Sequence, residues 1–254
     1  MKVIHNNSPY MKVKRFIKAV VIKFTGNFNY EKVVILGKQR TGSSLLVTLL
    51  RSHPHLELKG EAFRLLYGNS CRSVWNENFG KKLPWLKYMG FKLFYNHPDD
   101  SEDREVWDFI KKDTSIRIIH IKRKDLLRTY VSKLIAEKTG AWRSSQEKKG
   151  VDFKKQVEID IEDCIDNLRN SVQVETEFGI VMFPNHPYLE LTYEELTTDI
   201  QGTMSKVLEF LGVKKIKVNS PLKRQNPEGL NELVSNYDDL AEALRKTEFG
   251  YLVD

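Results

Sequence analysis

The sequence is poor in cysteine and in long apolar runs, and it contains no internal repeat. Its 254 residues include only two cysteines, Cys71 and Cys164, which form neither a disulfide framework nor the paired spacing of a zinc site. No stretch approaches the roughly 18 apolar residues that a membrane-spanning helix needs. Two isolated thiols are typical of a reducing compartment, so we expect a cytoplasmic protein without a resident metal.

Basic residues outnumber acidic ones. Lysine and arginine total 41 against 34 aspartates and glutamates, which gives a net charge of +7. A positive balance favours anionic ligands such as nucleotides, nucleic acid, acidic glycans or a membrane surface, and does not choose among them. The hydrophobic fraction of 41% is ordinary for a globular protein.

The first 31 residues are basic, and we interpret 1–31 as an irregular N-terminal arm before a single domain over 32–254. Within the arm, residues 16–24 (FIKAVVIKF) are apolar and punctuated by lysines. This pattern favours a surface or packing helix before the first strand, and the alternative is a basic amphipathic helix resting on a membrane surface. Both interpretations stay open.

Apolar runs in the remaining sequence alternate between strand and helix patterns. Strands are predicted at 33–36, 90–94, 116–121 and 188–191. Helices are predicted from Ser43 or Ser44, over 126–135 with Asp125 as N-cap and Gly140 as stop, over 159–177, over 207–211, and over 230–244. This order predicts an α/β, P-loop-like three-layer fold with a central, mostly parallel sheet flanked by helices. The polar residues 139–150 are either a lid or a plain connection.

A glycine-bounded loop joins the first strand to the first helix of this pattern. Gly37 and Gly42 have the spacing of an ATP-binding Walker loop, but Ser43 stands where that loop requires lysine. The basic residue is instead Arg40, inside the loop. Backbone N–H groups and the helix dipole make such a loop an anion site.

Residues 39–46 (QRTGSSLL) resemble the 5′-phosphosulfate loop of PAPS-dependent sulfotransferases, in particular bacterial carbohydrate sulfotransferases. The resemblance implies PAPS as sulfuryl donor and PAP as product. It assigns donor contacts to six loop residues, which are Arg40, Thr41, Gly42, Ser43, Ser44 and Leu45.

Three later segments resemble further donor-binding parts of that family. Residues 119–123 followed by Ser132 resemble the 3′-phosphate site, in which Lys124 competes with Arg123 for the arginine position. We favour Arg123 because a guanidinium binds phosphate in bidentate fashion. The resemblance also places Tyr193 near the adenine. It places a basic segment over the 3′-phosphate, formed by Lys223, Arg224, Gln225 and Asn226.

Sulfuryl transfer to a hydroxyl is an in-line displacement in which charge grows on the leaving phosphate oxygen, where Arg40 would meet it. The acceptor hydroxyl needs a base. Glu61 is the candidate if partial burial raises its pKa, and the alternative is that Glu61 caps the next helix. His53 and His55 are rival bases. A lysine in the middle of a strand, Lys92, would be costly to bury unless it faced the site.

The predicted function is therefore transfer of a sulfuryl group from PAPS to a hydroxyl acceptor. A carbohydrate acceptor is favoured, a lipid or small natural product stays open, and nucleic acid is not expected. Three tryptophans, Trp75, Trp85 and Trp142, either stack on such an acceptor or pack in the core. Two rival functions are a magnesium- and ATP-dependent P-loop kinase and a non-enzymatic module that binds polyanions.

Overall fold

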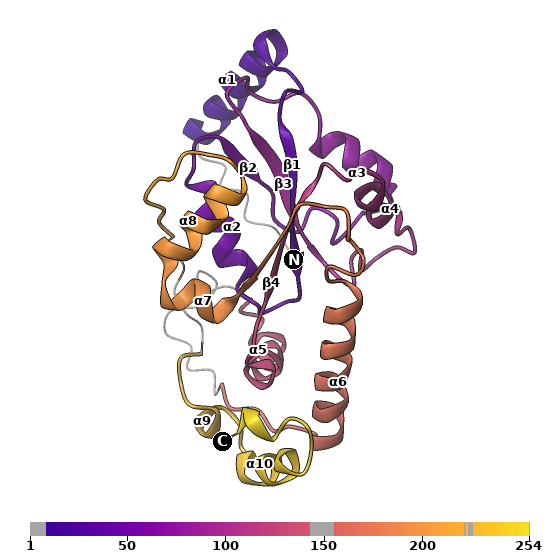
Figure 1. The fold of residues 1–254 in the computed structure, drawn as a ribbon, viewed down its shortest axis with the longest axis vertical. Coiled ribbons are helices and arrows are strands. Elements are labelled where there is room, and N and C mark those ends of the chain that lie inside the picture. Colours follow the sequence, from indigo (N-terminus) through magenta and orange to yellow (C-terminus); the bar gives the residue numbers. More distant parts are fainter. Residues whose placement is uncertain (1–8, 143–154, 221, 223–225, 254) are drawn as a thin grey trace.

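The computed structural model describes residues 9–142, 155–220, 222 and 226–253, and its centre is a five-stranded, all-parallel sheet in the order β2-β3-β1-β4-β5 (Figure 1). The strands are β1 (Glu31–Gly37), β2 (Leu56–Leu58), β3 (Tyr88–Phe94), β4 (Arg117–Lys122) and β5 (Tyr188–Thr192). The helices are α1 (Pro9–Thr25), α2 (Ser43–Arg51), α3 (Cys71–Asn78), α4 (Glu105–Lys112), α5 (Leu126–Thr139), α6 (Ile161–Glu177), α7 (Tyr193–Thr198), α8 (Ile200–Phe210), α9 (Leu230–Leu233), α10 (Tyr237–Arg245) and the short 3₁₀ helix η2 (Gly250–Leu252). None of the helices within these ranges is long and apolar enough to cross a bilayer.

The central strand β1 is apolar and buried from Val33 to Leu36 because helices cover both faces of the sheet. Val33 and Ile35 pack into one core with α2 and α8, whereas Val34 and Leu36 pack into a second core with α3 and α4. Alternate side chains of a strand point to opposite faces, so a continuous apolar run suits a doubly covered strand. The predicted three-layer α/β fold is confirmed.

A third cluster of apolar residues lies beyond the sheet, where α5, α6, α9 and α10 pack together. Figure 1 shows these helices at the lower end of the molecule. The predicted caps of α5 are present, since the Asp125 side chain accepts from the backbone N–H of Arg128 and Gly140 adopts the left-handed conformation at the C-cap.

The ends of the chain differ from the prediction in two places. The arm described as irregular is helical over α1, which contains residues 16–24, where both interpretations of the sequence placed a helix; its 17 residues include no glycine, and its only proline is the first residue, where a helix tolerates it. The single helix predicted over 230–244 is two helices, because Val234 is extended and pairs with Val157 in a parallel bridge. The Asn236 side chain fixes that break by hydrogen bonds to the backbone N–H and carbonyl of Ile159.

All five strands are parallel, so their carboxyl ends meet at one edge of the sheet. The loop after β1, the end of β3 at Phe94, Arg123 after β4 and Tyr193 after β5 are therefore neighbours. Ligands of open α/β sheets bind at this edge.

Candidate active site

A hydrogen bond within the loop between β1 and α2 stabilises its conformation. The Thr41 hydroxyl donates to the Lys38 carbonyl at 2.7 Å, and Thr41 is buried, so this side chain organises the loop and does not face the cavity. Gly42 has a φ of +84°, and a Cβ there would lie 2.5 Å from Cδ2 of Tyr193. No side chain caps the start of α2. Its first backbone N–H groups are thus available to an anion.

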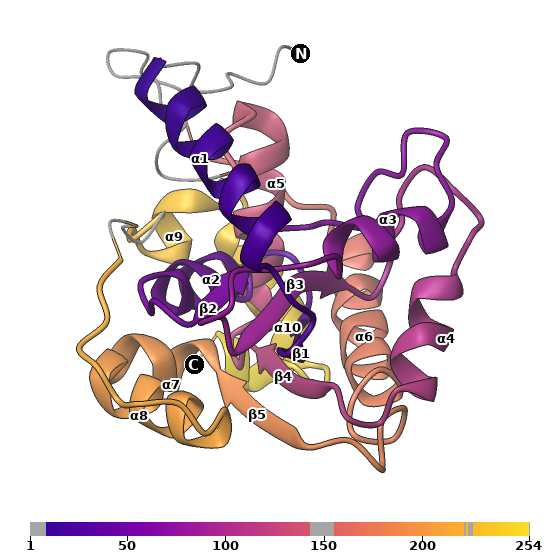
Figure 2. The same ribbon diagram turned by 90° about the horizontal axis from the view of Figure 1, so that it is seen from above.

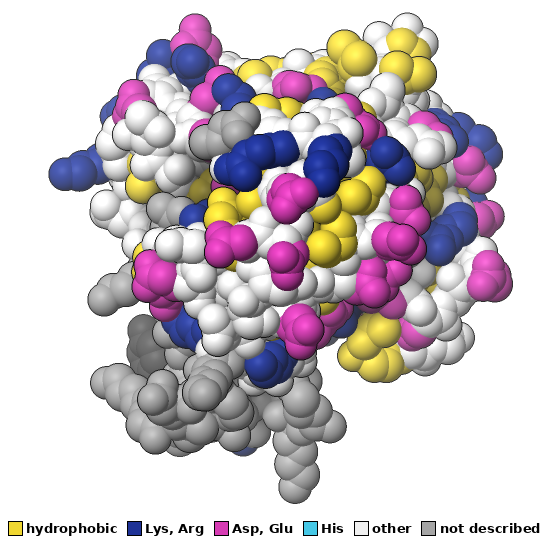
Figure 3. All heavy atoms as spheres, turned by 90° about the horizontal axis from the view of Figure 1, so that it is seen from below, with side chains coloured by type: hydrophobic (Ala, Val, Ile, Leu, Met, Phe, Trp, Pro, Cys, Tyr) yellow, Lys and Arg dark blue, Asp and Glu magenta, His cyan; other side chains and the backbone are white. Residues whose placement is uncertain are grey.

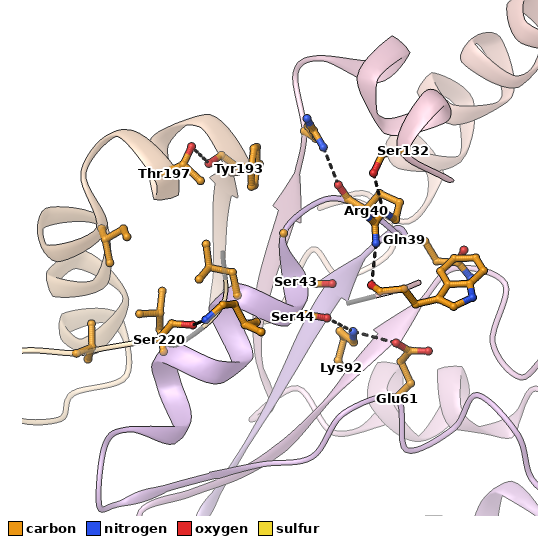
Figure 4. A pocket seen from close by; sticks show the side chains of 18 of the residues that line it. Gln39, Arg40, Ser43, Ser44, Glu61, Lys92, Ser132, Tyr193, Thr197 and Ser220 are labelled. Carbon is orange, nitrogen blue, oxygen red and sulfur yellow. Dashed lines mark hydrogen bonds and ion pairs between the residues drawn. The ribbon is translucent and has the colours of Figure 1, made fainter. Parts of the chain in front are cut away.

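A cavity of about 450 Å³ opens over this loop. Figure 4 shows Glu61 and Lys92 on one side, Ser43 and Ser44 in the middle, and the residues of α7 and of the segment near Ser220 on the other. Of the loop residues assigned to the donor, those that line the cavity are Arg40, Gly42, Ser43, Ser44 and Leu45.

Two guanidinium groups meet at the cavity wall. Arg40 donates from Nε to Ser132 Oγ at 2.9 Å and from Nη1 to the Trp142 carbonyl at 2.8 Å (Figure 4). Arg123 donates from Nη1 to the Arg40 carbonyl at 3.1 Å. Burial lowers the pKa of both side chains, and the charge of Arg123 lowers the pKa of Arg40 further. Both remain protonated, so the cavity wall concentrates positive charge in a partly desolvated place.

Arg123, rather than Lys124, lines the cavity. Its side chain is 9% exposed and lies over the Tyr193 ring at 4.6 Å, whereas Lys124 is exposed to solvent. Its buried Nε has no hydrogen-bond partner among the described residues. A buried donor without an acceptor is costly, and an anionic ligand oxygen would satisfy it.

Asn226 completes the surroundings of Ser132. Its side-chain amide lies 3.4 Å from Ser132 Oγ, and it lines a small second cavity with Arg123, Arg128 and Ser132. Arg128 is tied to the same segment by a 2.8 Å hydrogen bond to the Glu228 carbonyl. The predicted donor residues Lys223, Arg224 and Gln225 lie outside the described residues.

The buried Lys92 and the partly exposed Glu61 form an ion pair on the other side of the loop. Lys92 is 2% exposed, and its Nζ lies 2.9 Å from Glu61 Oε1 and 3.0 Å from Ser44 Oγ. The expectation that burial raises the pKa of Glu61 is wrong. Burial does act in that direction, but the charge and hydrogen bond of Lys92 outweigh it and lower the pKa of Glu61. Glu61 also caps no helix, since α3 is capped by Ser70.

The rival bases lie away from the cavity. His53 is buried with Nε2 3.0 Å from the Lys214 carbonyl, and His55 Nδ1 lies 2.7 Å from the Trp85 carbonyl. Of the three tryptophans, Trp142 lines the cavity, Trp75 packs against the core and Trp85 is exposed.

Several lining residues had no signal in the sequence. They are Phe94 beside the loop, and Thr197, Ile200, Gln201, Val218, Asn219, Ser220 and Leu222 on the far side. The far-side group comes from α7, the start of α8 and the segment after it. A hydrogen bond from the Gln201 amide to the Val218 carbonyl at 2.9 Å brings that segment to the cavity. This contact depends on tertiary packing, not on a local motif.

Comparison with known proteins gives one family and several distant structures. A search of curated protein sequences finds no match. Among solved structures, mouse sulfotransferase SULT7A1 complexed with PAP is 16% identical, with 79% of this chain and 65% of that chain covered and a TM-score of 0.45. A sulfotransferase from Alicyclobacillus acidocaldarius is 16% identical over 87% and 94% of the two chains, with a TM-score of 0.48. Retinol dehydratase in a complex with retinol and PAP is 14% identical over 82% and 65%, with a TM-score of 0.37.

The chain thus spans about two thirds of the length of the mouse protein and of retinol dehydratase. The family model of the sulfotransferase domain matches residues 30–234, a range that contains every residue lining the cavity. On that match over most of its length, the chain belongs to the sulfotransferase domain family.

Proposed function

We propose that this protein transfers a sulfuryl group from PAPS to a hydroxyl acceptor, with a carbohydrate as the favoured acceptor. Family membership supports sulfuryl transfer as the class of reaction. The observation that carries the proposal is that one cavity brings together an anion-binding loop, two arginines and a buried lysine–carboxylate pair. A sulfuryl donor needs the first two, and an acceptor hydroxyl needs the carboxylate.

The donor would lie across the loop. Backbone N–H groups at the start of α2, with the hydroxyls of Ser43 and Ser44, are suited to the 5′-phosphosulfate. Arg123 would hold the 3′-phosphate. Its buried Nε has no hydrogen-bond acceptor among the described residues, and Ser132 lines the same small cavity. Tyr193, whose ring already carries the Arg123 guanidinium at 4.6 Å, offers its surface to the adenine.

Glu61 would act as the base. Lys92 lowers the pKa of Glu61, so the carboxylate is ionised at neutral pH but is a weaker base than an ordinary glutamate. Its assignment as the base therefore rests on its place in the cavity wall beside Lys92. As the acceptor O–H bond breaks, the proton goes to Glu61, the acceptor oxygen bonds to sulfur, and the bond from sulfur to the phosphate oxygen breaks to release PAP. Lys92 and Arg40 supply positive charge beside the leaving oxygen, which stabilises the transition state.

An acceptor would enter from the side of Glu61. Trp142 and Phe94 line that part of the cavity, and aromatic faces of this kind suit the C–H faces of a sugar ring. The lack of the Walker lysine at Ser43 disfavours the rival kinase.

A ligand comparison tests the proposal. We expect PAP at about 100 times its Kd to stabilise the fold by about 2.7 kcal/mol, which is a rise of about 5–10 °C in Tm. ATP with magnesium, and heparin, should shift Tm far less. Sulfate transfer from sulfur-labelled PAPS to a panel of glycans, lipids and small alcohols then identifies the acceptor class. A shift with ATP and magnesium but none with PAP would show the proposal to be wrong.

A further inference from the structure

Helix α1 carries an apolar stripe that faces away from the rest of the protein. Five exposed side chains recur at spacings of three or four residues, which places them on one face of the helix. They are Val13, Phe16, Ile17, Val20 and Phe24. Phe16 is 70% exposed and Phe24 79% exposed. Two phenylalanines of this exposure on the same face of one helix are unusual for a surface that meets only water.

The opposite side of α1 is fixed to the domain. Lys18 pairs with Glu57 of β2 at 2.6 Å, and Val21 and Ile22 are partly covered. Just after the helix, Asn27 and Lys82 exchange two backbone hydrogen bonds of 3.0 and 2.9 Å. The helix is therefore held so that its apolar stripe points outward, and Figure 2 shows it projecting from the body of the molecule.

The charge of α1 has a single sign. Its sequence contains five lysines and arginines and no aspartate or glutamate. By helical position, Lys12 and Lys23 flank the apolar stripe on one side, and both are exposed. The opposite end of the molecule, seen in Figure 3, intersperses acidic and basic side chains.

We propose that α1 docks the protein on an anionic lipid surface, with Phe16 and Phe24 inserted at the level of the headgroups. An apolar stripe flanked by lysines on a helix too short and too charged to cross a bilayer is the pattern of an interfacial helix. Anionic headgroups attract the flanking lysines. A second copy of this chain would present the same positive charge against itself, so the charges disfavour a dimer through this face.

Docking through α1 leaves the active site accessible. The helix adjoins the amino end of β1 (Figure 1). The cavity is lined by residues at the carboxyl ends of the strands. Lipid binding and transfer to a soluble acceptor are therefore separable, and the docking proposal does not depend on the proposed function.

Flotation of the full chain with vesicles tests the proposal. We expect binding to vesicles of phosphatidylcholine with 30% phosphatidylglycerol, weak binding to pure phosphatidylcholine, and loss of binding as salt is raised. Phe16→Ser with Phe24→Ser should reduce the bound fraction about tenfold. Lys12→Glu with Lys23→Glu should reduce it at least about fivefold on the anionic vesicles only.

A matched control uses exposed apolar residues elsewhere. Ile180 and Val181 are 58% and 71% exposed, in the turn after α6. Ile180→Ser with Val181→Ser should leave vesicle binding unchanged, and all variants should keep the Tm of the original chain. Absence of vesicle binding, or binding unaffected by the α1 variants, overturns the proposal. So does a concentration-dependent dimer in light scattering that the phenylalanine variant abolishes, because that outcome assigns the stripe to a second copy.

Discussion

The two halves of the cavity are built on different physical principles. The half that we propose to bind the donor, called the donor half, offers backbone N–H groups and two arginines, so several groups would share the binding of one anion. The half that we propose to receive the acceptor, called the acceptor half, has one ion pair between the buried Lys92 and the partly exposed Glu61. Damage to the donor half should therefore weaken donor affinity by degrees, whereas damage to the acceptor half should stop transfer without weakening the donor. The predictions below separate these two effects.

The largest expected effect is that of Glu61→Gln. Removing a general base lowers the rate by about 10²–10⁴-fold, and we expect kcat to fall within that range while the Kd for PAP stays unchanged. Labelled PAPS measures the rate, and calorimetry measures the Kd. The matched control is Glu57→Gln, because Glu57 also pairs with a lysine but lies outside the cavity. If the Glu61 variant keeps full turnover, Glu61 is not the base.

The donor half is tested by Arg123→Ala. Charge-assisted hydrogen bonds to a buried group contribute about 1.5–3 kcal/mol, so the Kd for PAP should rise about 10–100-fold. Lys124→Ala is the control, since Lys124 is the neighbouring cation in sequence and is exposed. Its Kd should change less than about twofold. The reverse result, with the larger loss at Lys124, would assign the 3′-phosphate to the lysine and contradict the placement of Arg123.

The same contrast explains how much of the site could be predicted. The donor half follows from short motifs, because a buried strand, a glycine-bounded loop and a helix place Arg40, Ser43 and Ser44 by local geometry. The acceptor half depends on contacts across long stretches of chain. Glu61 and Lys92 are 31 positions apart, and only the pairing of β2 with β3 brings them together. The sequence predicted a raised pKa for Glu61, whereas the structure indicates a lowered one. The prediction was wrong because it did not include the ion pair between Glu61 and Lys92.

The fold shows the same division. Every predicted strand is present, because a short apolar run bounded by polar turns is typical of a buried strand. The short strand β2 and the break between α9 and α10 were missed. Each depends on pairing with a distant segment, as Val234 does with Val157. The apolar residues of α1 were visible in the sequence, but the side of the helix that faces the domain depends on tertiary contacts such as the Lys18–Glu57 pair.

A smaller effect is expected at Gly42. Its φ of +84° and the 2.5 Å approach of a Cβ to Tyr193 mean that Gly42→Ala strains the loop and displaces the ring. A left-handed backbone costs a residue with a Cβ about 1–2 kcal/mol. We expect a lower Tm and a Kd for PAP about tenfold higher. Gly140→Ala is the matched control, since Gly140 has a φ of +68° with nothing within 4 Å of the added carbon. Gly140→Ala should lower Tm in the same way and leave the Kd for PAP unchanged, because the added carbon is not near Tyr193. A Kd that is also unchanged in Gly42→Ala would mean that Tyr193 does not contact the donor.

The smallest expected effect is a change in the pH dependence of kcat/KM when Lys92 is replaced. Lys92 contacts both halves of the cavity, through Ser44 and Glu61. In the native protein Lys92 outweighs the burial of Glu61 and holds the pKa of Glu61 below its ordinary 4.5. A base must be ionised, so kcat/KM should stay level as the pH falls through the ordinary range of glutamate. In Lys92→Met the burial remains and its main opposing charge is gone, so the pKa of Glu61 must rise. The fall of kcat/KM on the acid side of the pH profile, the acid limb, should then move to higher pH. The variant should also have a lower kcat/KM at every pH.

Stability should follow the same direction. A carboxylate with a lowered pKa in the folded state stabilises the protein above its unfolded pKa, and that contribution is lost as the pH falls through the folded pKa. The native protein should therefore lose Tm on acidification below about pH 4.5. Lys92→Met should lose less in that window, because it no longer has the ion pair to lose. Lys18→Met, which removes a lysine paired with a carboxylate outside the cavity, should leave the acid limb where it is. An acid limb that does not move in Lys92→Met would mean that the titrating base is not Glu61, and the acceptor half would then need a different base.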